Sequence, residues 1–170
     1  GVRVLTYGLS ADADVRAEAL RCAADGSRFM VTWSNERHDY AVPLPGRHNV
    51  SNALAALAAG FVLGYTPQEM QTGLRRLAVT KMRYEVHEVG AWTFINDAYN
   101  ASPASTRASL KTLAEMFAGR KIAVLGDMLE LGSASKSGHA SVGEEAVRLG
   151  FAAVLTRGEE SRFIAQAAKE

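Results

Sequence analysis

Two polar clusters in the middle of the chain carry side chains that could bind a ligand. Asp97, Tyr99 and Asn100 follow the apolar run 92–95, and Asp127 follows a second predicted strand at 121–125. A predicted helix separates the two runs, and two strands joined by one helix form a β-α-β unit with parallel strands. Both clusters would then lie at the carboxyl edge of one sheet, which is where open α/β sheets bind their ligands.

A second candidate site stands at the start of a helix upstream. His48 and Asn49 precede an apolar stripe that runs at helical spacing from Val50 to Val62, and Asn52 lies one turn beyond Asn49 on the same side. Amides at the positive end of a helix could bind the donors and acceptors of a heterocycle. Alternatively, Asn49 is only the N-cap and His48 is a surface residue. Asn52 favours binding slightly, because asparagine is mildly unfavourable inside a helix.

The segments around the first polar cluster indicate how it is positioned. Ser102 is a good N-cap, and Pro103 fits the first helical position, where no N–H is needed. Apolar residues then recur at helical spacing until Gly119 ends the helix. Arg83 closes the segment 78–83, which has the character of a linker. An arginine at such a junction is usually just exposed, but its planar fork can also reach a phosphate.

The order of the predicted elements indicates an α/β fold. The N-terminal part contains short strands at 2–7, 28–33 and 39–44, which suggest a small antiparallel or mixed sheet. The charged residues between the first two of these strands are interpreted as a solvated face. Thr66 caps a further helix, whose apolar residues, including Leu77, should face inward. Residues 84–89 and 92–95, separated by Gly90, are expected to form a hairpin or two adjacent strands. The second half alternates strands and helices, which specifies a mainly parallel sheet covered by helices.

The last part of the chain continues this alternation. Residues 132–138 form a loop rich in Ser and Gly, and a helix from Ser141 to Leu149 follows it. A strand at 151–155 and a helix at 159–168 complete the pattern. His139, near the start of the first of these helices, is expected to be structural or exposed.

Composition excludes several classes of protein. The 170 residues carry a net charge of +1, so the charge balance favours neither nucleic acid nor an anionic membrane as a partner. Cys22 is the one cysteine, which excludes an internal disulfide and fits a reducing cytoplasm. No apolar run reaches the roughly 18 residues of a membrane span. Both phosphate-binding motifs, G-x-x-x-x-G-K-[ST] and G-x-G-x-x-G, are missing, and no metal site is predicted.

Three stretches resemble a known family. LPGRHNVSNALAA at 44–56 resembles the segment that closes the central ATPase domain of the Mur ligases. NDAYNASP at 96–103 and AVLGDMLELG at 123–132 are similar to the branch of that family that adds a dipeptide rather than a single amino acid. The resemblance implies that residues 1–81 are the end of the central ATP-binding domain. Residues 82–170 would form most of a Rossmann-like C-terminal domain.

The resemblance also implies an activity, that of an ATP-dependent amide ligase in peptidoglycan precursor synthesis. In the family, ATP phosphorylates the carboxylate of UDP-N-acetylmuramoyl-tripeptide, and the amine of D-Ala-D-Ala attacks the acyl phosphate. The family's phosphate loop and its Mg²⁺ ligands lie in an earlier part of the central domain, outside this chain. The chain is therefore expected to be a cytoplasmic fragment that is inactive without the missing N-terminal portion of the same enzyme.

Residue roles follow from the same resemblance, position by position. Asn49 and Asn52, beside His48, should contact adenine. Arg83 should reach the ATP phosphates and act in catalysis, and Asp97 should bind the ribose hydroxyls. Ser102 stands where many relatives have asparagine, and it preserves the capping function. The other expected contacts shape the cleft: Tyr99 on the nucleotide side, and Asn100, Ser102, Asp127 and Glu130 on the dipeptide side.

Two other interpretations stay open. One is a sister Mur ligase or a ligase similar to folylpolyglutamate synthase, which would add a different amine. Those enzymes carry other residues in place of Asp-Ala-Tyr-Asn. The other is a non-catalytic nucleotide-binding module of flavodoxin-like type, formed by the second half alone. Such a module would not need the polar helix start at 48–52.

Overall fold

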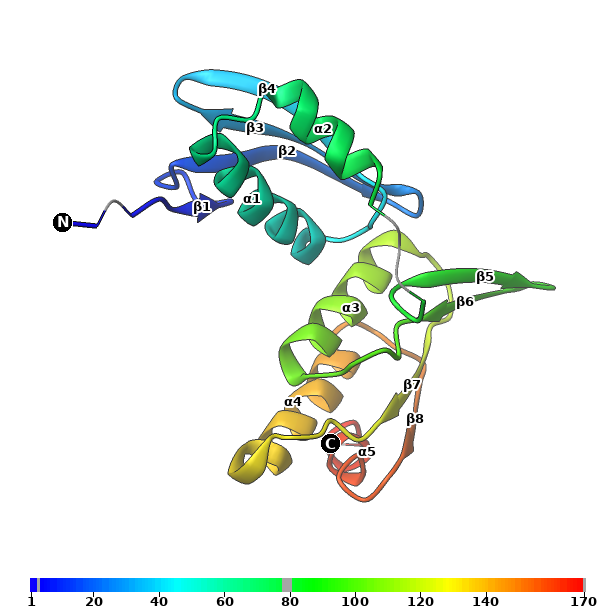
Figure 1. Ribbon diagram of the computed structural model, residues 1–170. Coiled ribbons are helices and arrows are strands. Elements are labelled where there is room, and N and C mark those ends of the chain that lie inside the picture. The colour runs from blue at the N-terminus through cyan, green and yellow to red at the C-terminus, as the bar shows by residue number, and fades with distance from the viewer. Residues whose placement is uncertain (3, 78–80, 170) are drawn as a thin grey trace. The chain divides into compact units, whose positions relative to one another are not determined.

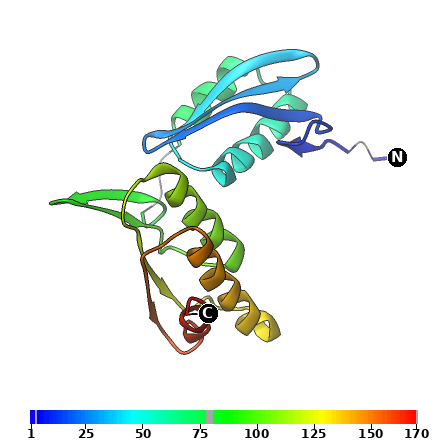
Figure 2. The same cartoon turned by 180° about the vertical axis from the view of Figure 1, so that it is seen from behind.

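The computed structural model describes residues 1–2, 4–77 and 81–169. The chain divides into two compact units, Gly1–Asn96 and Asp97–Glu170. Figure 1 shows the elements of both units coloured along the chain, and Figure 2 shows the same elements from behind. Strands and helices alternate in the second unit, so the α/β class predicted from the sequence is confirmed.

A mixed four-stranded sheet forms the body of the first unit. Its strands lie in the order β1 (Tyr7–Gly8), β2 (Val15–Ala23), β3 (Gly26–Trp33) and β4 (Glu36–Val42). β1 runs parallel to β2, and the other neighbouring strands are antiparallel. The register of β2 against β3 shifts between Glu18 and Arg21, and Ala19 takes a left-handed φ of 53° there. This irregularity has the character of a β-bulge, which bends a strand locally.

Two helices, α1 (Arg47–Val62) and α2 (Pro67–Arg75), cover one face of this sheet (Figures 1 and 2). Alternate residues of the strands point toward the helices, because side chains alternate across a strand. The core therefore joins three strands to both helices, and it consists of Val15, Ala17, Phe29, Val31, Tyr40, Val42, Val50, Ala53, Leu54, Leu57, Ala58 and Leu74. Trp33 stacks on Phe61 beside this core, with 5.4 Å between the ring centroids.

Helix α2 has Thr66 as its N-cap, as the sequence predicts. The Thr66 hydroxyl accepts the Glu69 N–H at 3.3 Å, and the Glu69 carboxylate accepts the Thr66 N–H at 2.8 Å. One turn on, the buried Gln71 side chain accepts the Ala41 N–H at 2.9 Å and donates to the Ala41 carbonyl at 3.2 Å. This amide bonds the backbone of β4, whose other neighbour in the sheet is β3. Unpaired strand edges are a liability that proteins cover in such ways.

Two predictions for the strands of the first unit were wrong. A strand was predicted over 2–7, but of the described residues there only Tyr7 belongs to one. β2 was not predicted, because its charges suggested a solvated face. In the structure, Arg16 and Glu18 alternate with buried residues of β2 and form an ion pair of 2.9 Å.

The prediction that two further side chains face inward was also wrong. Val62 is 66% exposed and Leu77 is 44% exposed. The helices stop before these side chains can pack, since α1 ends at Val62 itself and α2 ends at Arg75. The other apolar positions of the α1 stripe are buried or pack against the core.

The strands β5 (Glu85–Val89) and β6 (Trp92–Asn96) form the predicted hairpin around Gly90. Val89 pairs with Trp92, and both side chains are exposed. Among the described residues, β6 pairs only with β5 and β7 pairs only with β8, so the prediction that 92–95 and 121–125 belong to one sheet is wrong. A two-residue turn closes far less chain than a crossover helix does, which favours the hairpin pairing.

The second unit contains a parallel pair of strands, β7 (Ile122–Gly126) and β8 (Ala153–Arg157). Helices α3 (Pro103–Met116), α4 (Ser135–Arg148) and α5 (Arg162–Ala167) accompany it, with a short 3₁₀ turn, η1 (Gly132–Ala134), before α4. Their common core consists of Leu110, Ala123, Met128, Val142, Ala146 and Ile164. None of the helices that the structure describes is long and apolar enough to cross a membrane.

At the helix starts of the second unit, the prediction for α3 was correct and the prediction for α4 was wrong. α3 has Ser102 as its N-cap and Pro103 at its first position, as predicted. The predicted loop at 132–138 is instead the 3₁₀ turn and the first turn of α4. Burial of His139 and the residues after it in the core outweighs the weak helix propensity of the Ser-rich segment. The last strand and helix also begin two or three residues later than predicted.

Candidate functional site

The polar start of α1 is held by local contacts. Gly46 is the N-cap, with a φ of 100° that favours glycine, so the alternative that Asn49 caps the helix is wrong. Asn49 Nδ2 donates to the Pro45 carbonyl at 2.8 Å and lies 3.1 Å from His48 Nε2. These contacts orient the Asn49 amide and leave its Oδ1 atom to accept a hydrogen bond from a ligand.

Asn52 extends this polar start along the helix. It is exposed, and Asn49 is half-buried one turn earlier. Residues three positions apart lie on the same side of a helix, so the structure brings the two amides to one surface. A half-buried acceptor beside an exposed amide suits a flat ring that carries both donors and acceptors on its edge.

Arg83 lies in a strained segment. Its neighbours Met82 and Tyr84 have left-handed φ values of 61° and 52°. Such conformations cost of order 1 kcal/mol for each non-glycine residue, and they gather at functional segments. Tyr84 is buried whereas Arg83 is exposed. The rest of the predicted linker, 78–80, lies outside the described residues.

The polar segment before α3 contains four predicted site residues. Asp97 and Tyr99 are exposed. Asn100 accepts the following backbone N–H with its side-chain oxygen at 2.9 Å. The hydroxyl of Ser102 accepts the Ser105 N–H at 3.2 Å, and the Ser105 hydroxyl accepts the Ser102 N–H at 3.0 Å. Ser102 therefore has a capping role, and a contact with the dipeptide stays a prediction.

Asp127 follows β7 and is tied to the turn before α5. Its Oδ1 atom accepts the Ser161 N–H at 2.7 Å. This hydrogen bond holds the pKa of the Asp127 carboxyl below its ordinary value, because it favours the ionised form. A Cβ atom at Gly158 would lie 2.1 Å from the carboxylate, so glycine is required for this close approach. The structure thus gives Asp127 an intramolecular partner that sequence reasoning missed.

Residues 127–131 form what we call the 127–131 loop. In this loop Met128 faces inward, whereas Leu129 and Glu130 face outward. Met128 is buried in the core of the second unit, and its sulfur accepts the Thr106 hydroxyl at 3.7 Å. Leu129 is 75% exposed, and Glu130 is exposed with a left-handed φ of 62°. The loop therefore holds an apolar side chain and a carboxylate in solvent on a strained backbone.

His139 is the residue near this loop whose role the sequence did not reveal. It is completely buried. Its Nε2 atom accepts the Met128 N–H at 2.9 Å, and its Nδ1 atom donates to the Ser135 carbonyl at 2.8 Å. The Ser135 hydroxyl also lies 3.3 Å from Nδ1. The Met128 partner is a backbone N–H eleven residues away, so no pattern of residue types could have predicted that contact. The expectation that His139 is structural or exposed resolves in favour of the structural role.

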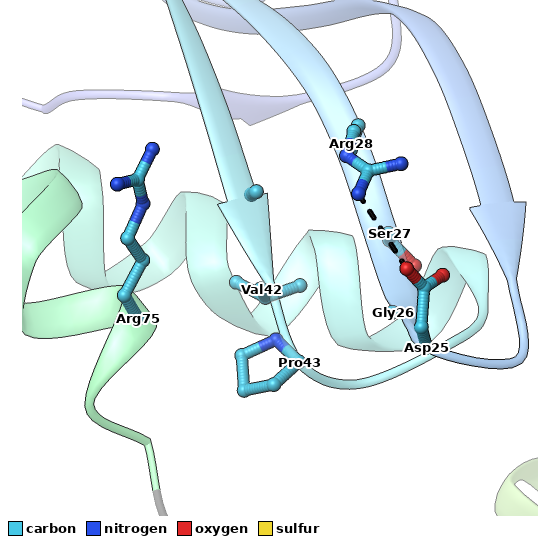
Figure 3. Close-up of a pocket in the computed structure, with 8 residues that line it drawn as sticks. Asp25, Gly26, Ser27, Arg28, Val42, Pro43 and Arg75 are labelled. Carbon is cyan, nitrogen blue, oxygen red and sulfur yellow. Dashed lines mark hydrogen bonds and ion pairs between the residues drawn. The ribbon is translucent and has the colours of Figure 1, made fainter.

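The structure also contains a shallow hollow outside the predicted site. It lies at the end of the first sheet, where the β2–β3 turn meets the end of β4 and Arg75 of α2 (Figure 3). Asp25 and Arg28 form an ion pair of 3.5 Å at its rim. None of the residues predicted to bind a ligand lines it. The hollow therefore gives no support to the predicted chemistry.

Within residues 1–2, 4–77 and 81–169, no group of three or more His, Cys, Asp or Glu could hold a metal. Asp127 and Glu130, the carboxylates after β7, therefore do not form part of such a group. The polar start of α1 and the polar segments after β6 and β7 remain the candidate ligand contacts.

Two family models match the chain. The model described as "Mur ligase middle domain" matches residues 1–60, and the model described as "Mur ligase, glutamate ligase domain" matches residues 82–170. The second match alone covers the larger part of the chain. The chain belongs to the Mur ligase family.

Individual relatives agree with this assignment. UDP-N-acetylmuramoyl-tripeptide–D-alanyl-D-alanine ligase of Bacillus subtilis is 36% identical over 165 residues, which are 96% of this chain and 36% of the relative. UDP-N-acetylmuramate–L-alanine ligase of Novosphingobium aromaticivorans is 38% identical over 134 residues, which are 72% of this chain and 28% of the relative. A crystal structure of MurF from Acinetobacter baumannii superposes with a TM-score of 0.88 at 28% identity, over 97% of this chain and 36% of that one. The chain thus spans about a third of the length of these relatives.

Proposed function

We propose that this chain forms part of an ATP-dependent amide ligase that joins D-Ala-D-Ala to UDP-N-acetylmuramoyl-tripeptide in the cytoplasm. Residues 1–81 would close its ATP-binding domain, and residues 82–170 would form most of its C-terminal domain. One observation carries the proposal: a ligase with this named activity aligns with 96% of the chain at 36% identity. The two family models, at 1–60 and 82–170, support the same division.

The start of α1 suits the adenine ring. Asn49 uses its N–H groups within the protein and offers Oδ1, which can accept a bond from the exocyclic amine. Asn52, one turn on, is exposed and can supply the complementary donor. His48 holds the Asn49 amide through a 3.1 Å contact, so its contribution is to orient that amide. Adenine would therefore meet one amide, that of Asn49, whose orientation is largely set before binding.

Arg83 and Asp97 suit the remainder of the nucleotide. Bound ATP would supply the phosphoryl group that activates the tripeptide carboxylate for attack by the amine. Arg83 is an exposed, permanently charged fork, and such a fork can neutralise charge on phosphate oxygens during the transfer. The exposed Asp97 carboxylate can accept hydrogen bonds from ribose hydroxyls, and the exposed ring of Tyr99 can flank the nucleotide.

The amine substrate is assigned to the segments after β6 and β7. Asn100 and Ser102 lie before α3, and Asp127 and Glu130 lie in the 127–131 loop. The Glu130 carboxylate is exposed and could attract the amino group of a dipeptide. Mg²⁺ and the phosphate-binding loop are assigned to residues outside this chain. The chain alone is therefore proposed to be inactive until the missing N-terminal portion of the enzyme completes the site.

A sister activity is the second candidate. The L-alanine ligase of Novosphingobium aromaticivorans is slightly more identical, at 38%, but it aligns with only 72% of the chain. The dipeptide ligase aligns over the longer stretch and is therefore favoured. A non-catalytic module is disfavoured, because the Mur ligase middle domain matches residues 1–60 as well.

The test is a phosphate-release assay on a full-length ligase that contains this chain, with UDP-N-acetylmuramoyl-tripeptide and ATP. D-Ala-D-Ala should support release, whereas single amino acids should not. The same ligase with UDP-N-acetylmuramate and L-alanine tests the sister activity. Release with L-alanine only would overturn the proposal in favour of the sister ligase, and no release with any amine would overturn the ligase assignment. The 170-residue chain assayed alone should release no phosphate.

A further inference from the structure

We propose that His139 is a positioning residue, which fixes the 127–131 loop so that Leu129 and Glu130 face the incoming amine substrate. The inference rests on the proposed function for the identity of that substrate. The part concerning the loop itself rests only on the contacts of His139. No contact between His139 and a substrate is involved, since the ring is completely buried.

The hydrogen bonds of His139 define its role. Because the Ser135 carbonyl can only accept, the proton of the ring lies on Nδ1, which is 2.8 Å away. Because the Met128 N–H can only donate, Nε2 must be the unprotonated nitrogen, at 2.9 Å. A neutral ring of this one tautomer satisfies both backbone groups at once. The ring therefore connects the first turn of α4 to the backbone of the loop.

Two further contacts converge on the same place. Asp127 accepts the Ser161 N–H at 2.7 Å, which ties the beginning of the loop to the turn before α5. The Ser135 hydroxyl bonds the Glu160 carboxylate, which ties the first turn of α4 to that turn. Glu160 and Ser161 are neighbours in the chain. The loop, α4 and the turn before α5 are thus connected in a closed set of contacts, and His139 is its buried member.

This set of contacts controls what the loop exposes. Met128 is held at its N–H by His139 and at its sulfur by Thr106, and its side chain is buried. The next two residues are outside the core, and Glu130 needs a left-handed φ of 62°. A free loop would avoid that conformation, because it is disfavoured for residues other than glycine. Holding Met128 therefore maintains the exposed pair Leu129 and Glu130 in one arrangement.

That arrangement is chemically complementary to a small amphipathic amine. The Glu130 carboxylate can pair with an ammonium group, and the Leu129 side chain can contact methyl groups. D-Ala-D-Ala carries one amino group and two methyl groups. His139 would then act on dipeptide binding through the loop, while the nucleotide contacts at α1 and Asp97 would not depend on it.

The test compares two amide substitutions at His139 in the full-length ligase. The His139→Gln side chain can reach the Met128 N–H with its oxygen, whereas the shorter His139→Asn side chain can bond only the nearer Ser135 carbonyl. We expect His139→Asn to raise KM for D-Ala-D-Ala roughly tenfold, equivalent to the loss of about one hydrogen bond, with KM for ATP unchanged. His139→Gln should stay near the wild-type value. Thr112→Val is the stability control, because it removes a buried hydroxyl of α3 that bonds Ala108 at 2.9 Å.

Amide hydrogen exchange on the full-length ligase gives an independent readout. Met128 N–H should exchange faster in His139→Asn than in His139→Gln. Equal exchange in the two variants, or an unchanged KM for D-Ala-D-Ala in His139→Asn, would overturn the inference. A rise in both KM values, matched by Thr112→Val, would show a general loss of stability and would also overturn it. Failure of the proposed function is recognised separately, because the wild-type ligase would then show no reaction with D-Ala-D-Ala.

Discussion

The two regions proposed to bind ligands are built in opposite ways. At the start of α1, the hydrogen bonds of Asn49 go to residues one and four positions away, His48 and Pro45. In the 127–131 loop, Met128 and Asp127 bond to residues 11, 22 and 34 positions away. The first region is organised by its own helix, and the second depends on the packing of three helices. Damage to distant packing should therefore affect the second region far more than the first.

The largest expected effect tests the core under the first region. Leu54→Ala should lower the free energy of unfolding by about 2–5 kcal/mol, because Leu54 is completely buried between α1 and the sheet. The matched control is Val62→Ala, which truncates an exposed side chain on the same helix and should change stability by less than about 0.5 kcal/mol. Urea denaturation of the 170-residue chain measures both. Equal losses would mean that the register of α1 differs from the one described.

A smaller effect tests the packing that supports the second region. A Cβ atom at Gly143 would lie 2.3 Å from the Ile164 carbonyl oxygen, so α4 and α5 pack too closely for a methyl group. Gly143→Ala should therefore lower stability by about 1–3 kcal/mol, as overpacking does. Gly73→Ala in α2 is the control, since nothing lies within 4 Å of its added Cβ. It should stabilise by about 0.5–1 kcal/mol through helix propensity.

Gly143 also bears on the comparison of the two regions. In the full-length ligase, Gly143→Ala should raise KM for D-Ala-D-Ala more than KM for ATP. Movement of α5 against α4 would displace the turn that holds Asp127. An equal change in both constants would contradict the idea that distant packing organises only the second region.

The smallest expected effect depends on pH. The Ser161 N–H holds the folded-state pKa of Asp127 below its ordinary value of 3.8. A carboxyl with a lowered folded-state pKa stabilises the fold above its unfolded pKa, and that contribution is lost as pH falls through the folded pKa. Asp127→Asn should therefore be less stable than wild type at pH 7, and the difference should shrink on acidification below about pH 4. Urea midpoints between pH 7 and pH 2.5 measure this, and a difference that stays constant would contradict it.

The sequence predicted those parts of the fold that depend on neighbouring residues. The caps at Thr66 and Ser102, the α1 stripe and the hairpin around Gly90 all follow from local patterns. The first turn of α4 did not, because the burial of His139 decides it and the Ser-rich composition suggests a loop. The prediction that 92–95 and 121–125 belong to one sheet failed, since among the described residues β6 pairs with β5 and β7 pairs with β8.

The same difference between local patterns and distant contacts applies to the candidate site. Residue types and family resemblance pointed to Asn49, Asn52 and Asp97 without any knowledge of packing. Their exposure or partial exposure is consistent with that prediction. The ties of Asp127 to Ser161 and of His139 to Met128 involve backbone N–H groups far along the chain. Every residue except proline has such a group, so the sequence carries no signal for these contacts.

The most direct test of the central claim is a crossed comparison of two variants in the full-length ligase. The claim is that the start of α1 binds the nucleotide and that the 127–131 loop binds the amine. Asn49→Ala should raise KM for ATP roughly tenfold and leave KM for D-Ala-D-Ala unchanged, and Glu130→Ala should do the reverse. The result that would contradict the account is a pair of variants that change both constants together or that change neither.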